Sequence, residues 1–376
     1  MLTIHYSRAI DSRANTLRRI AKVLGVGSLV LCVLAAVSPP AAAKEKYTID
    51  PVTGTKYKAD PEMRELLVAW AALGGKPIET LTPTEARLQP TMADAANALL
   101  KKRGEDPDPA KAAPDVTIVD ATIPVQDGTQ LTATLYTPPG PGPFPAVVYF
   151  HGGGWVLADK HDASERALAK GAEVVVISVD YRLAPENKFP TAWDDALAAY
   201  KWTATNVGRW RGDPRRLALA GEGAGGNLAI STALSAVGAG VTRPKAVIAI
   251  YPVTQTGAAT ESYVDSANAK PLNKAMIAWS LDKTLSTAAD KTDPRLDIIH
   301  AKLSLLPPVT IINAQIDPLR SDGVMLEEAL KQAKVKVTRK EYEGMTHDFF
   351  GAAAVLPAAK SAQSFAAEQI KDAFKE

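Results

Sequence analysis

The feature that most constrains the fold is an apolar run that ends in a cluster of glycines and continues directly into a helical pattern. Residues 217–220 are apolar, residues 221–226 read GEGAGG, and residues 227–237 have the composition and length of a helix. A strand that turns sharply into a helix is the basic unit of proteins that alternate the two elements. The sequence therefore predicts a strand, a tight turn at Gly223 and a helix that starts at Asn227.

Short apolar segments recur from residue 116 onward, and helical patterns over residues 192–203, 227–237 and 324–333 separate the later ones. The middle segments are nearly continuous apolar runs, as expected for parallel strands that helices cover on both faces. These patterns indicate an α/β domain over residues 114–376, with a mostly parallel sheet flanked by helices. The predicted strands span residues 116–123, 131–136, 146–150, 174–179, 217–220, 246–251, 309–313 and 335–342.

Residues 1–43 have the pattern of a cleaved signal peptide. Basic residues precede an apolar run over residues 23–37, prolines at 39 and 40 end that run, and three alanines at 41–43 offer a cleavage site. The alternative is a membrane anchor, but the run is shorter than the roughly 20 apolar residues that span a bilayer. We therefore expect an exported protein, periplasmic or secreted, that keeps no membrane span after processing.

Charge and cysteine content narrow the partners further. The formal net charge of +2 gives no reason to expect binding to nucleic acid. The single cysteine, Cys32, lies within residues 1–43, so the mature protein would contain no disulfide. Its own core must then hold an exported chain together.

Residues 44–113 are predicted to form helices that cap the main domain. Asp60-Pro61 is typical of a helix start, and Thr82-Pro83-Thr84-Glu85 has the pattern of a capping box that opens a second helix. The first helix would bury an apolar face made of Leu66, Leu67, Trp70 and Leu73. These helices either pack on the main domain for stability alone or form a lid over an active site, and residues 252–300 could add a second part to such a cap.

A glycine-rich loop follows the predicted strand that ends at Phe150. It reads His151-Gly152-Gly153-Gly154-Trp155, so backbone N–H groups there can approach a ligand without obstruction by side chains. Such donors stabilise the negative oxygen of a tetrahedral acyl-transfer intermediate. The alternative is an ordinary flexible turn, but the position at a strand end favours an oxyanion loop. His151 is expected to shape this loop and not to act as a base.

Three further loops carry polar residues of interest. Tyr181-Arg182 begins a loop that we interpret as held by an arginine ion pair, a supporting role. Asp317 follows one predicted strand, and His347 follows the last one. A loop carboxylate followed later in the chain by a loop histidine fits the order nucleophile, acid, base. In such a triad the acid orients the imidazole, and the imidazole takes a proton from the nucleophile.

Residues 115–350 resemble the bacterial hormone-sensitive-lipase-like esterases, the HGGG branch of the α/β-hydrolases. The motifs that carry the resemblance lie, in order, at residues 151–155, 181–186, 221–227, 317–320 and 344–349. The resemblance implies an α/β-hydrolase fold with an eight-stranded sheet, a helical cap built largely from the N-terminal segment, and no metal or organic cofactor. It also implies a small-molecule ester or carboxylate as partner, and it allows a homodimer that pairs the last strands.

Carried over by position, the resemblance also assigns roles to single residues. It implies that Asp317 is the acid, that His347 is the base, and that the backbones of Gly152, Gly153 and Ala224 form the oxyanion hole. Residues in supporting positions are His151, Gly154, Glu222, Tyr181 and Arg182.

The serine of the family falls on Gly223, which has no side-chain atom that could attack a carbonyl. Ser231 lies further along the predicted helix, roughly 12 Å away by helical rise, and Ser178 belongs to another strand. Glu222 is adjacent, but the turn should point its side chain away from the site. Glycine accepts the strained backbone of such turns, so Gly223 should leave the fold intact.

Three interpretations remain open, and with them the question of whether the chain is an active enzyme. The first is a carboxylic-ester hydrolase scaffold whose serine has been replaced, by design or by sequence error. The second is a pseudoenzyme that binds an ester-like or acidic small molecule, as in the similar plant gibberellin receptors with their incomplete triad. The third is a hydrolase or lyase in which His347 activates a water molecule directly.

Overall fold

The computed structural model describes residues 48–158, 162–257 and 259–375. The predicted signal peptide at residues 1–43 lies outside these ranges. The described chain forms one eight-stranded sheet with the order β1-β2-β4-β3-β5-β6-β7-β8. Its strands are β1 (Thr117–Pro124), β2 (Gln130–Thr137), β3 (Phe144–Phe150), β4 (Val175–Asp180), β5 (Gly212–Glu222), β6 (Val247–Ile250), β7 (Val309–Ile316) and β8 (Val337–Thr346).

The sheet is antiparallel at one edge and parallel elsewhere. β2 pairs antiparallel with both β1 and β4, whereas the remaining neighbours from β4 to β8 all pair in parallel. In the centre, Ala220 of β5 lies opposite Tyr149 of β3 and Ile248 of β6. The predicted eight-stranded, mostly parallel sheet is therefore confirmed.

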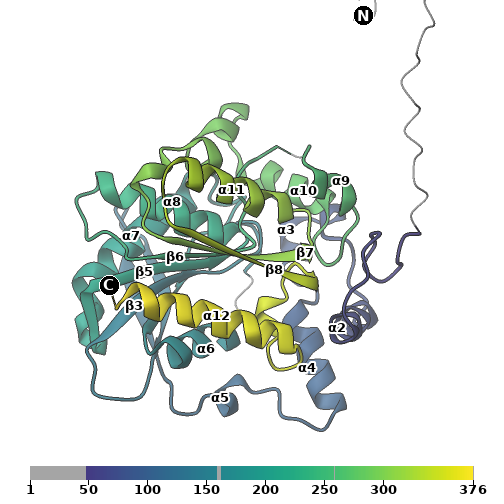
Figure 1. The fold of residues 1–376 in the computed structure, drawn as a ribbon, viewed down its shortest axis with the longest axis horizontal. Coiled ribbons are helices and arrows are strands. Elements are labelled where there is room, and N and C mark those ends of the chain that lie inside the picture. The colour runs from purple at the N-terminus through teal and green to yellow at the C-terminus, as the bar shows by residue number, and fades with distance from the viewer. Residues whose placement is uncertain (1–47, 159–161, 258, 376) are drawn as a thin grey trace, which may run out of the picture. The chain divides into compact units, whose positions relative to one another are not determined.

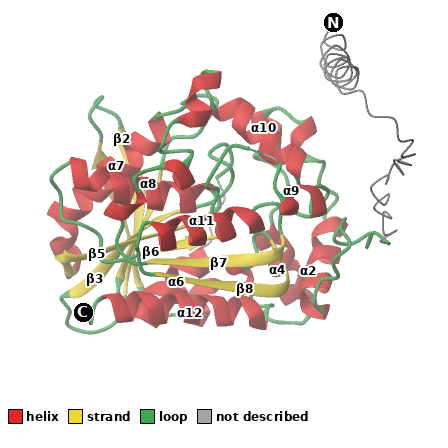
Figure 2. Ribbon diagram, turned by 45° about the horizontal axis from the view of Figure 1, so that its top comes forward, coloured by secondary structure: helices red, strands yellow, loops and turns green. Residues whose placement is uncertain are grey.

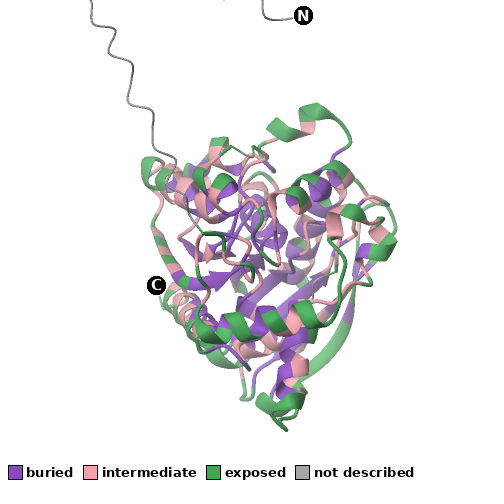
Figure 3. Ribbon diagram, turned by 90° about the vertical axis from the view of Figure 1, so that its right-hand side faces the viewer, coloured by how far each residue is buried: buried purple, intermediate pink, exposed green. Residues whose placement is uncertain are grey.

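Helices cover both faces of this sheet. Figure 1 shows α6 and α12 on one side, with α7, α8 and α11 on the other. The inner strands β3, β4, β6 and β7 are mostly buried, because apolar side chains on both of their faces are covered, whereas the edge strand β1 is largely exposed (Figure 3). The helices of eight or more residues are α2 (Pro61–Ala72), α4 (Met92–Lys102), α6 (Asp162–Ala172), α7 (Thr191–Asn206), α8 (Ala224–Gly238), α10 (Lys274–Thr284), α11 (Arg320–Gln332) and α12 (Pro357–Ala373). Shorter ones are α3 (Pro83–Ala86), α5 (Pro109–Ala112) and α9 (Glu261–Asp265).

The segment before β1 is helical, as predicted, but its details differ. Leu66 and Leu67 of α2 are buried, whereas Leu73, which was predicted to belong to the same apolar face, follows the end of α2 and is 39% exposed. The capping box at Thr82 is present but opens only the four-residue α3. A second capping box at Thr91 then opens α4, because Pro90 interrupts the helical pattern between them.

The long connection between β6 and β7 contains α9 and α10. Figure 2 shows both helices on the side of the sheet covered by α11. Residues from this connection and from the segment before β1 line one common cavity. Both segments that were predicted to form a cap therefore contribute residues to the same cavity.

Candidate active site

Gly223 forms the turn between β5 and α8. Its backbone has φ 52° and ψ −111°, a conformation in which any residue other than glycine is strained. Its N–H donates to the carbonyl of Ile250 at 2.9 Å, which ties the turn to the end of β6. α8 starts at Ala224 and not at Asn227 as predicted, because tertiary contacts override the low helix propensity of Gly225 and Gly226.

The glycine at position 225 lets α8 approach the end of β3 closely. A methyl group on Gly225 would have its carbon 2.0 Å from the carbonyl oxygen of Phe150 and 2.5 Å from that of His151. No side chain fits in that space. The glycines after Gly223 therefore bring the start of α8 against the loop that begins at His151.

Asp317 and His347 follow the neighbouring parallel strands β7 and β8, so the carboxyl ends of these strands bring the two side chains together. Oδ2 of Asp317 lies 2.7 Å from Nδ1 of His347 and accepts its hydrogen bond. The other carboxylate oxygen accepts from the backbone N–H of Leu319 at 2.8 Å. Asp317 is fully buried and His347 is 8% exposed, so water competes little for this pair.

The opposite nitrogen of His347 faces Gly223. A Cβ atom on Gly223 would lie 3.3 Å from Nε2 and 3.7 Å from Cε1 of the imidazole. The ring is also packed against Tyr251, with ring centroids 4.4 Å apart. The structure thus brings three of the predicted residues together: the carboxylate, the imidazole and the glycine at the nucleophile position.

Part of the glycine loop after β3 lines the cavity that the segment before β1 and the connection between β6 and β7 also line. Gly153 (φ 94°) and Gly154 (φ 61°) line it, together with Ala224. As the first residue of α8, Ala224 has a backbone N–H without an intrahelical acceptor. Gly152, which was predicted as a donor, is buried and does not line the cavity.

His151 and Tyr181 hold the glycine loop in shape. Their rings stack with centroids 4.3 Å apart. The hydroxyl of Tyr181 donates to the carbonyl oxygen of His151 at 2.9 Å, and Nδ1 of His151 donates to that of Gly152 at 2.8 Å. Both residues act on the loop backbone, in line with the supporting roles expected for them.

Arg182 forms ion pairs and does not reach the cavity. Its guanidinium binds both oxygens of Asp195 and pairs with Asp127 at 2.6 Å. Asp195 is fully buried, so this contact fixes the loop after β4 to α7. The interpretation of this motif as a loop held by an arginine ion pair agrees with these contacts.

Glu222 is buried behind the turn and points away from the cavity. Its two carboxylate oxygens accept hydrogen bonds from the hydroxyls of Tyr149 and Tyr251. Burial, with the neighbouring negative charge of Glu222, raises the pKa of both tyrosines well above the ordinary value. Glu222 therefore holds Tyr251, whose ring packs on His347.

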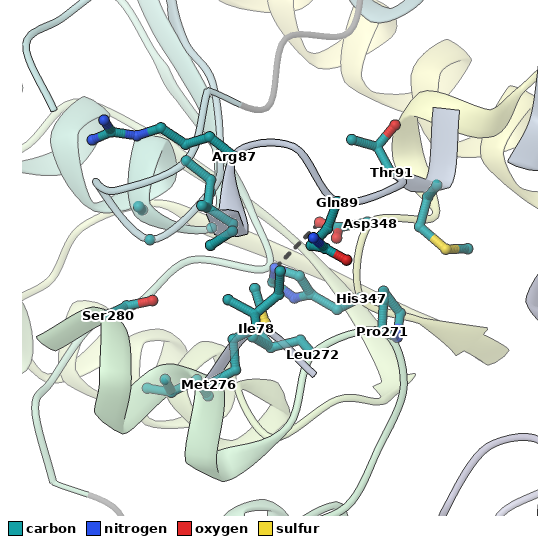
Figure 4. Close-up of a pocket in the computed structure, with 18 of the residues that line it drawn as sticks. Ile78, Arg87, Gln89, Thr91, Pro271, Leu272, Met276, Ser280, His347 and Asp348 are labelled. Atoms are coloured by element: carbon teal, nitrogen blue, oxygen red, sulfur yellow. Dashed lines mark ion pairs between the residues drawn. The ribbon is translucent and has the colours of Figure 1, made fainter. Parts of the chain in front are cut away.

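The cavity has a volume of about 190 Å³ and mainly apolar walls. Figure 4 shows His347 and Asp348 together with side chains from both cap segments. Apolar side chains in its wall include Trp70, Ile78 and Met92 from the segment before β1, Leu272, Met276, Ile277 and Leu281 from the connection between β6 and β7, and Trp155, Leu157, Val253 and Leu319 from other loops. Ser280 lines it as well, packed against Gly154.

Arg87, just after α3, fastens the first cap segment to the main domain. Its guanidinium binds both carboxylate oxygens of Glu186, at 2.8 and 2.7 Å. It also donates to the carbonyl oxygens of Val156 and Ala184. Sequence reasoning missed this contact because no local pattern links residues so distant along the chain.

Asp348 is a second residue that sequence reasoning missed. Its Oδ1 atom lies 3.5 Å from Nε2 of His347, at the cavity wall. The only signal for Asp348 in the sequence was its position next to His347.

The serines considered as substitutes for the nucleophile lie elsewhere. Ser178 donates a hydrogen bond to Glu165, and Ser231 is buried in α8.

No three His, Cys, Asp or Glu side chains in the described ranges gather in a way that could hold a metal ion. No helix in the same part of the chain has the length and apolarity to cross a bilayer.

Comparison with known proteins gives consistent matches. A family model described as the alpha/beta hydrolase fold matches residues 147–351. The carboxylesterase NlhH of Mycobacterium tuberculosis is 37% identical over 284 residues, which cover 72% of this chain and 88% of that protein. The ethyl acetate hydrolase of Pseudomonas putida is 33% identical over 287 residues, or 74% of this chain and 87% of that protein.

Solved structures agree with the sequence matches. The hyperthermophilic esterase from the archaeon Pyrobaculum calidifontis superposes with a TM-score of 0.75 at 35% identity, covering 84% of this chain and 98% of that one. A thermostable esterase from Pseudomonas putida superposes with a TM-score of 0.74 at 31% identity, covering 84% and 97%.

Proposed function

Because this chain belongs to the α/β-hydrolase fold family and has a carboxylesterase-type hydrolase scaffold, we propose that its site is built to hydrolyse carboxylic esters. One observation carries the proposal. Nε2 of His347 lies 3.3 Å from the position of a Cβ atom on Gly223, where the hydroxyl of a serine would come within hydrogen-bond reach.

Each group at the site then has a role. Asp317 orients the imidazole of His347 and stabilises its charged form, and His347 is the base that would take the proton of a nucleophile. The backbone N–H groups of Gly153, Gly154 and Ala224 stabilise the negative oxygen of the tetrahedral intermediate. We assign Gly154 in place of Gly152, since Gly154 lines the cavity and Gly152 does not.

Gly223 limits what the chain does with this site. Removing the serine of such a triad costs on the order of 10⁶ in turnover, while the oxyanion hole and binding leave about 10³–10⁴ over water. The unaltered chain is therefore a poor serine-type hydrolase. An ester or carboxylate would still bind in the apolar cavity.

A second candidate reaction uses His347 without a serine. The space beside Gly223 opens on Nε2 of His347 and on the cavity, so a water there would have the imidazole as its base. That water would attack the ester carbonyl directly, with no acyl-enzyme intermediate. Turnover by the unaltered chain that disappears in His347→Ala would support this reaction, and turnover that survives the change would exclude it.

The test of the main proposal is a paired assay. Gly223→Ser and the unaltered chain are compared on short-chain p-nitrophenyl esters, with Gly223→Ala as the control for backbone strain. Strong activity in Gly223→Ser alone supports the ester-hydrolase site. A folded but inactive Gly223→Ser protein would favour a binding function instead.

Export is a separate proposal that rests on the N-terminal sequence pattern. We infer that residues 1–43 are removed and that the mature protein begins at Lys44 in the periplasm or outside the cell. N-terminal sequencing of protein purified from the periplasm or medium tests this. An intact Met1 in the purified protein would contradict it.

A further inference from the structure

Asp348 places a second carboxylate on the imidazole of His347. Its Oδ1 atom lies 3.5 Å from Nε2, while Oδ2 of Asp317 lies 2.7 Å from Nδ1 of the same ring. Figure 4 shows the ion pair with Asp348 as a dashed line in the cavity. The proposed reaction uses Asp317 and His347 but gives no role to Asp348.

The backbone of Asp348 has an unusual conformation. Its φ is 63°, in the left-handed region that residues other than glycine seldom enter, although Asp and Asn tolerate it best. Strain of this kind persists where the surroundings demand it, and it concentrates at active sites. Here it occurs in the short turn between the end of β8 at Thr346 and the next helical turn, which starts at Phe350.

The position of the Asp348 carboxylate matters because of which nitrogen it faces. Nε2 is the atom directed at Gly223, and a nucleophile placed there would need it unprotonated. Asp348 is partly exposed, with 23% of its side chain accessible, so solvent screens its charge in part. Its carboxylate and the nucleophile position therefore lie on the same side of the ring.

Further charged groups lie near the ring or in the cavity wall in the described chain. Glu222 lies behind Tyr251, the ring that packs on His347, and both its oxygens accept tyrosine hydroxyls. Arg87 in the cavity wall is held by Glu186. Lys76 also lines the cavity and is an exposed residue. The ion pairs of the imidazole itself run to Asp317 and Asp348.

We propose that Asp348 is a positioning residue that, through its ion pair with Nε2, keeps His347 an imidazolium ion up to a higher pH than Asp317 alone would. Negative charge close to an imidazole favours the protonated ring, and here one carboxylate lies near each nitrogen. A protonated Nε2 cannot accept the proton of a nucleophile. Asp348 therefore sets the lower pH limit at which His347 acts as a base.

This inference rests on the proposed function for the role of His347, but the protonation of the ring can be followed without turnover. NMR of ¹⁵N-labelled imidazoles in the unaltered protein follows His347 through pH, with His347→Gln used to assign its signals. Asp348→Asn removes the charge and keeps a side chain suited to the left-handed backbone. Glu343→Gln, on an exposed position of β8, removes a charge of the same sign as the matched control.

We expect the titration midpoint of His347 to fall by about one pH unit in Asp348→Asn, the shift typical of losing one close opposite charge. Glu343→Gln should leave the midpoint within experimental error of the unaltered protein. Equal midpoints in Asp348→Asn and the unaltered protein would overturn the proposal. So would an equal fall in both variants, because it would indicate a general effect of charge.

A second test uses catalysis in the Gly223→Ser protein. The pH profile of kcat for Gly223→Ser/Asp348→Asn should keep its shape while its acid limb moves down by about one pH unit relative to Gly223→Ser. The shift of the acid limb, and not KM, measures this role, since Asp348 also lines the cavity. Superimposable profiles would contradict the role of Asp348. An inactive Gly223→Ser would contradict the proposed function instead, and the NMR result would still decide the role of Asp348.

Discussion

Nε2 of His347 lies 3.3 Å from the point that a Cβ atom on Gly223 would occupy. From that point a serine hydroxyl reaches Nε2 by rotation about one bond. Because Asp317 already fixes the other side of the ring, the site needs one hydroxyl group to complete a triad. This relationship leads to the first two predictions.

Gly223→Ser is expected to raise kcat/KM on p-nitrophenyl butyrate by at least about 10³-fold, because triad serines contribute on the order of 10⁶. Steady-state kinetics at a pH above the acid limb measure the gain. Gly223→Ala bears the same strain at φ 52°, about 1–3 kcal/mol, without a nucleophile. Equal activity in the serine and alanine variants would show that the hydroxyl does not react.

Asp317→Asn in the Gly223→Ser protein is expected to lower kcat by about 10⁴-fold, since an amide no longer stabilises the charged imidazole or fixes its tautomer. Asp317 is fully buried, so thermal denaturation must accompany the kinetics and show that the variant is folded. Asp127→Asn is the control, because Asp127 pairs with Arg182 and not with His347. A folded Asp317→Asn variant that retained most of its kcat would remove Asp317 from the mechanism.

The sequence is informative where function depends on neighbouring strands. β7 has a clear apolar pattern, whereas its parallel neighbour β8 carries several charged residues. The order of the loop residues after these strands nevertheless predicted that Asp317 and His347 act together, and the two are hydrogen-bonded. The sequence is less informative for β5, which begins at Gly212, because the polar residues Asp213, Arg215 and Arg216 hide its start. Local patterns report burial, and the first half of this strand is partly exposed.

The cavity wall could not be predicted from sequence for a different reason. Trp70 and Met276 lie in segments far apart along the chain, and only folding brings them to one cavity. The same holds for Arg87 and Glu186, whose contact joins the first cap segment to the main domain. The residues next to such side chains in the sequence do not indicate which cavity the side chains will line after folding.

Ligand binding should be detectable in the unaltered chain even without turnover. An ester or carboxylate that occupies the cavity is expected to raise Tm saturably, with about 2.7 kcal/mol of stabilisation at 100 times Kd. Met276→Trp, which narrows the cavity from α10, should abolish the shift. The absence of any shift across a broad panel of esters and carboxylates would count against binding at this cavity.

Asp322 should make stability fall as pH rises from about 4 to about 7. It is fully buried and accepts a hydrogen bond from the backbone of Thr254 at 3.0 Å. Burial raises its pKa from 3.8 to about 7. Between these values the folded state keeps a proton that the unfolded state releases, so the free energy of unfolding declines by a few kcal/mol at most. Urea denaturation at pH 5 and pH 8 should show Asp322→Asn gaining stability relative to the unaltered chain at the higher pH. A difference between the two proteins that did not vary with pH would contradict this prediction.

Two glycines of α8 should respond in opposite ways to alanine. A methyl group on Gly225 would meet the carbonyl oxygen of Phe150 at 2.0 Å, so either α8 or β3 must move. We expect Gly225→Ala to cost at least about 3 kcal/mol or to prevent folding, as overpacking against backbone does. Gly238, the last residue of the same helix, has open space at that position, and alanine there should be neutral or stabilise the protein by up to about 1 kcal/mol. Urea midpoints of the two variants measure the contrast. Equal midpoints would mean that the turn at Gly223 and the loop at His151 are not held as close together as the site requires.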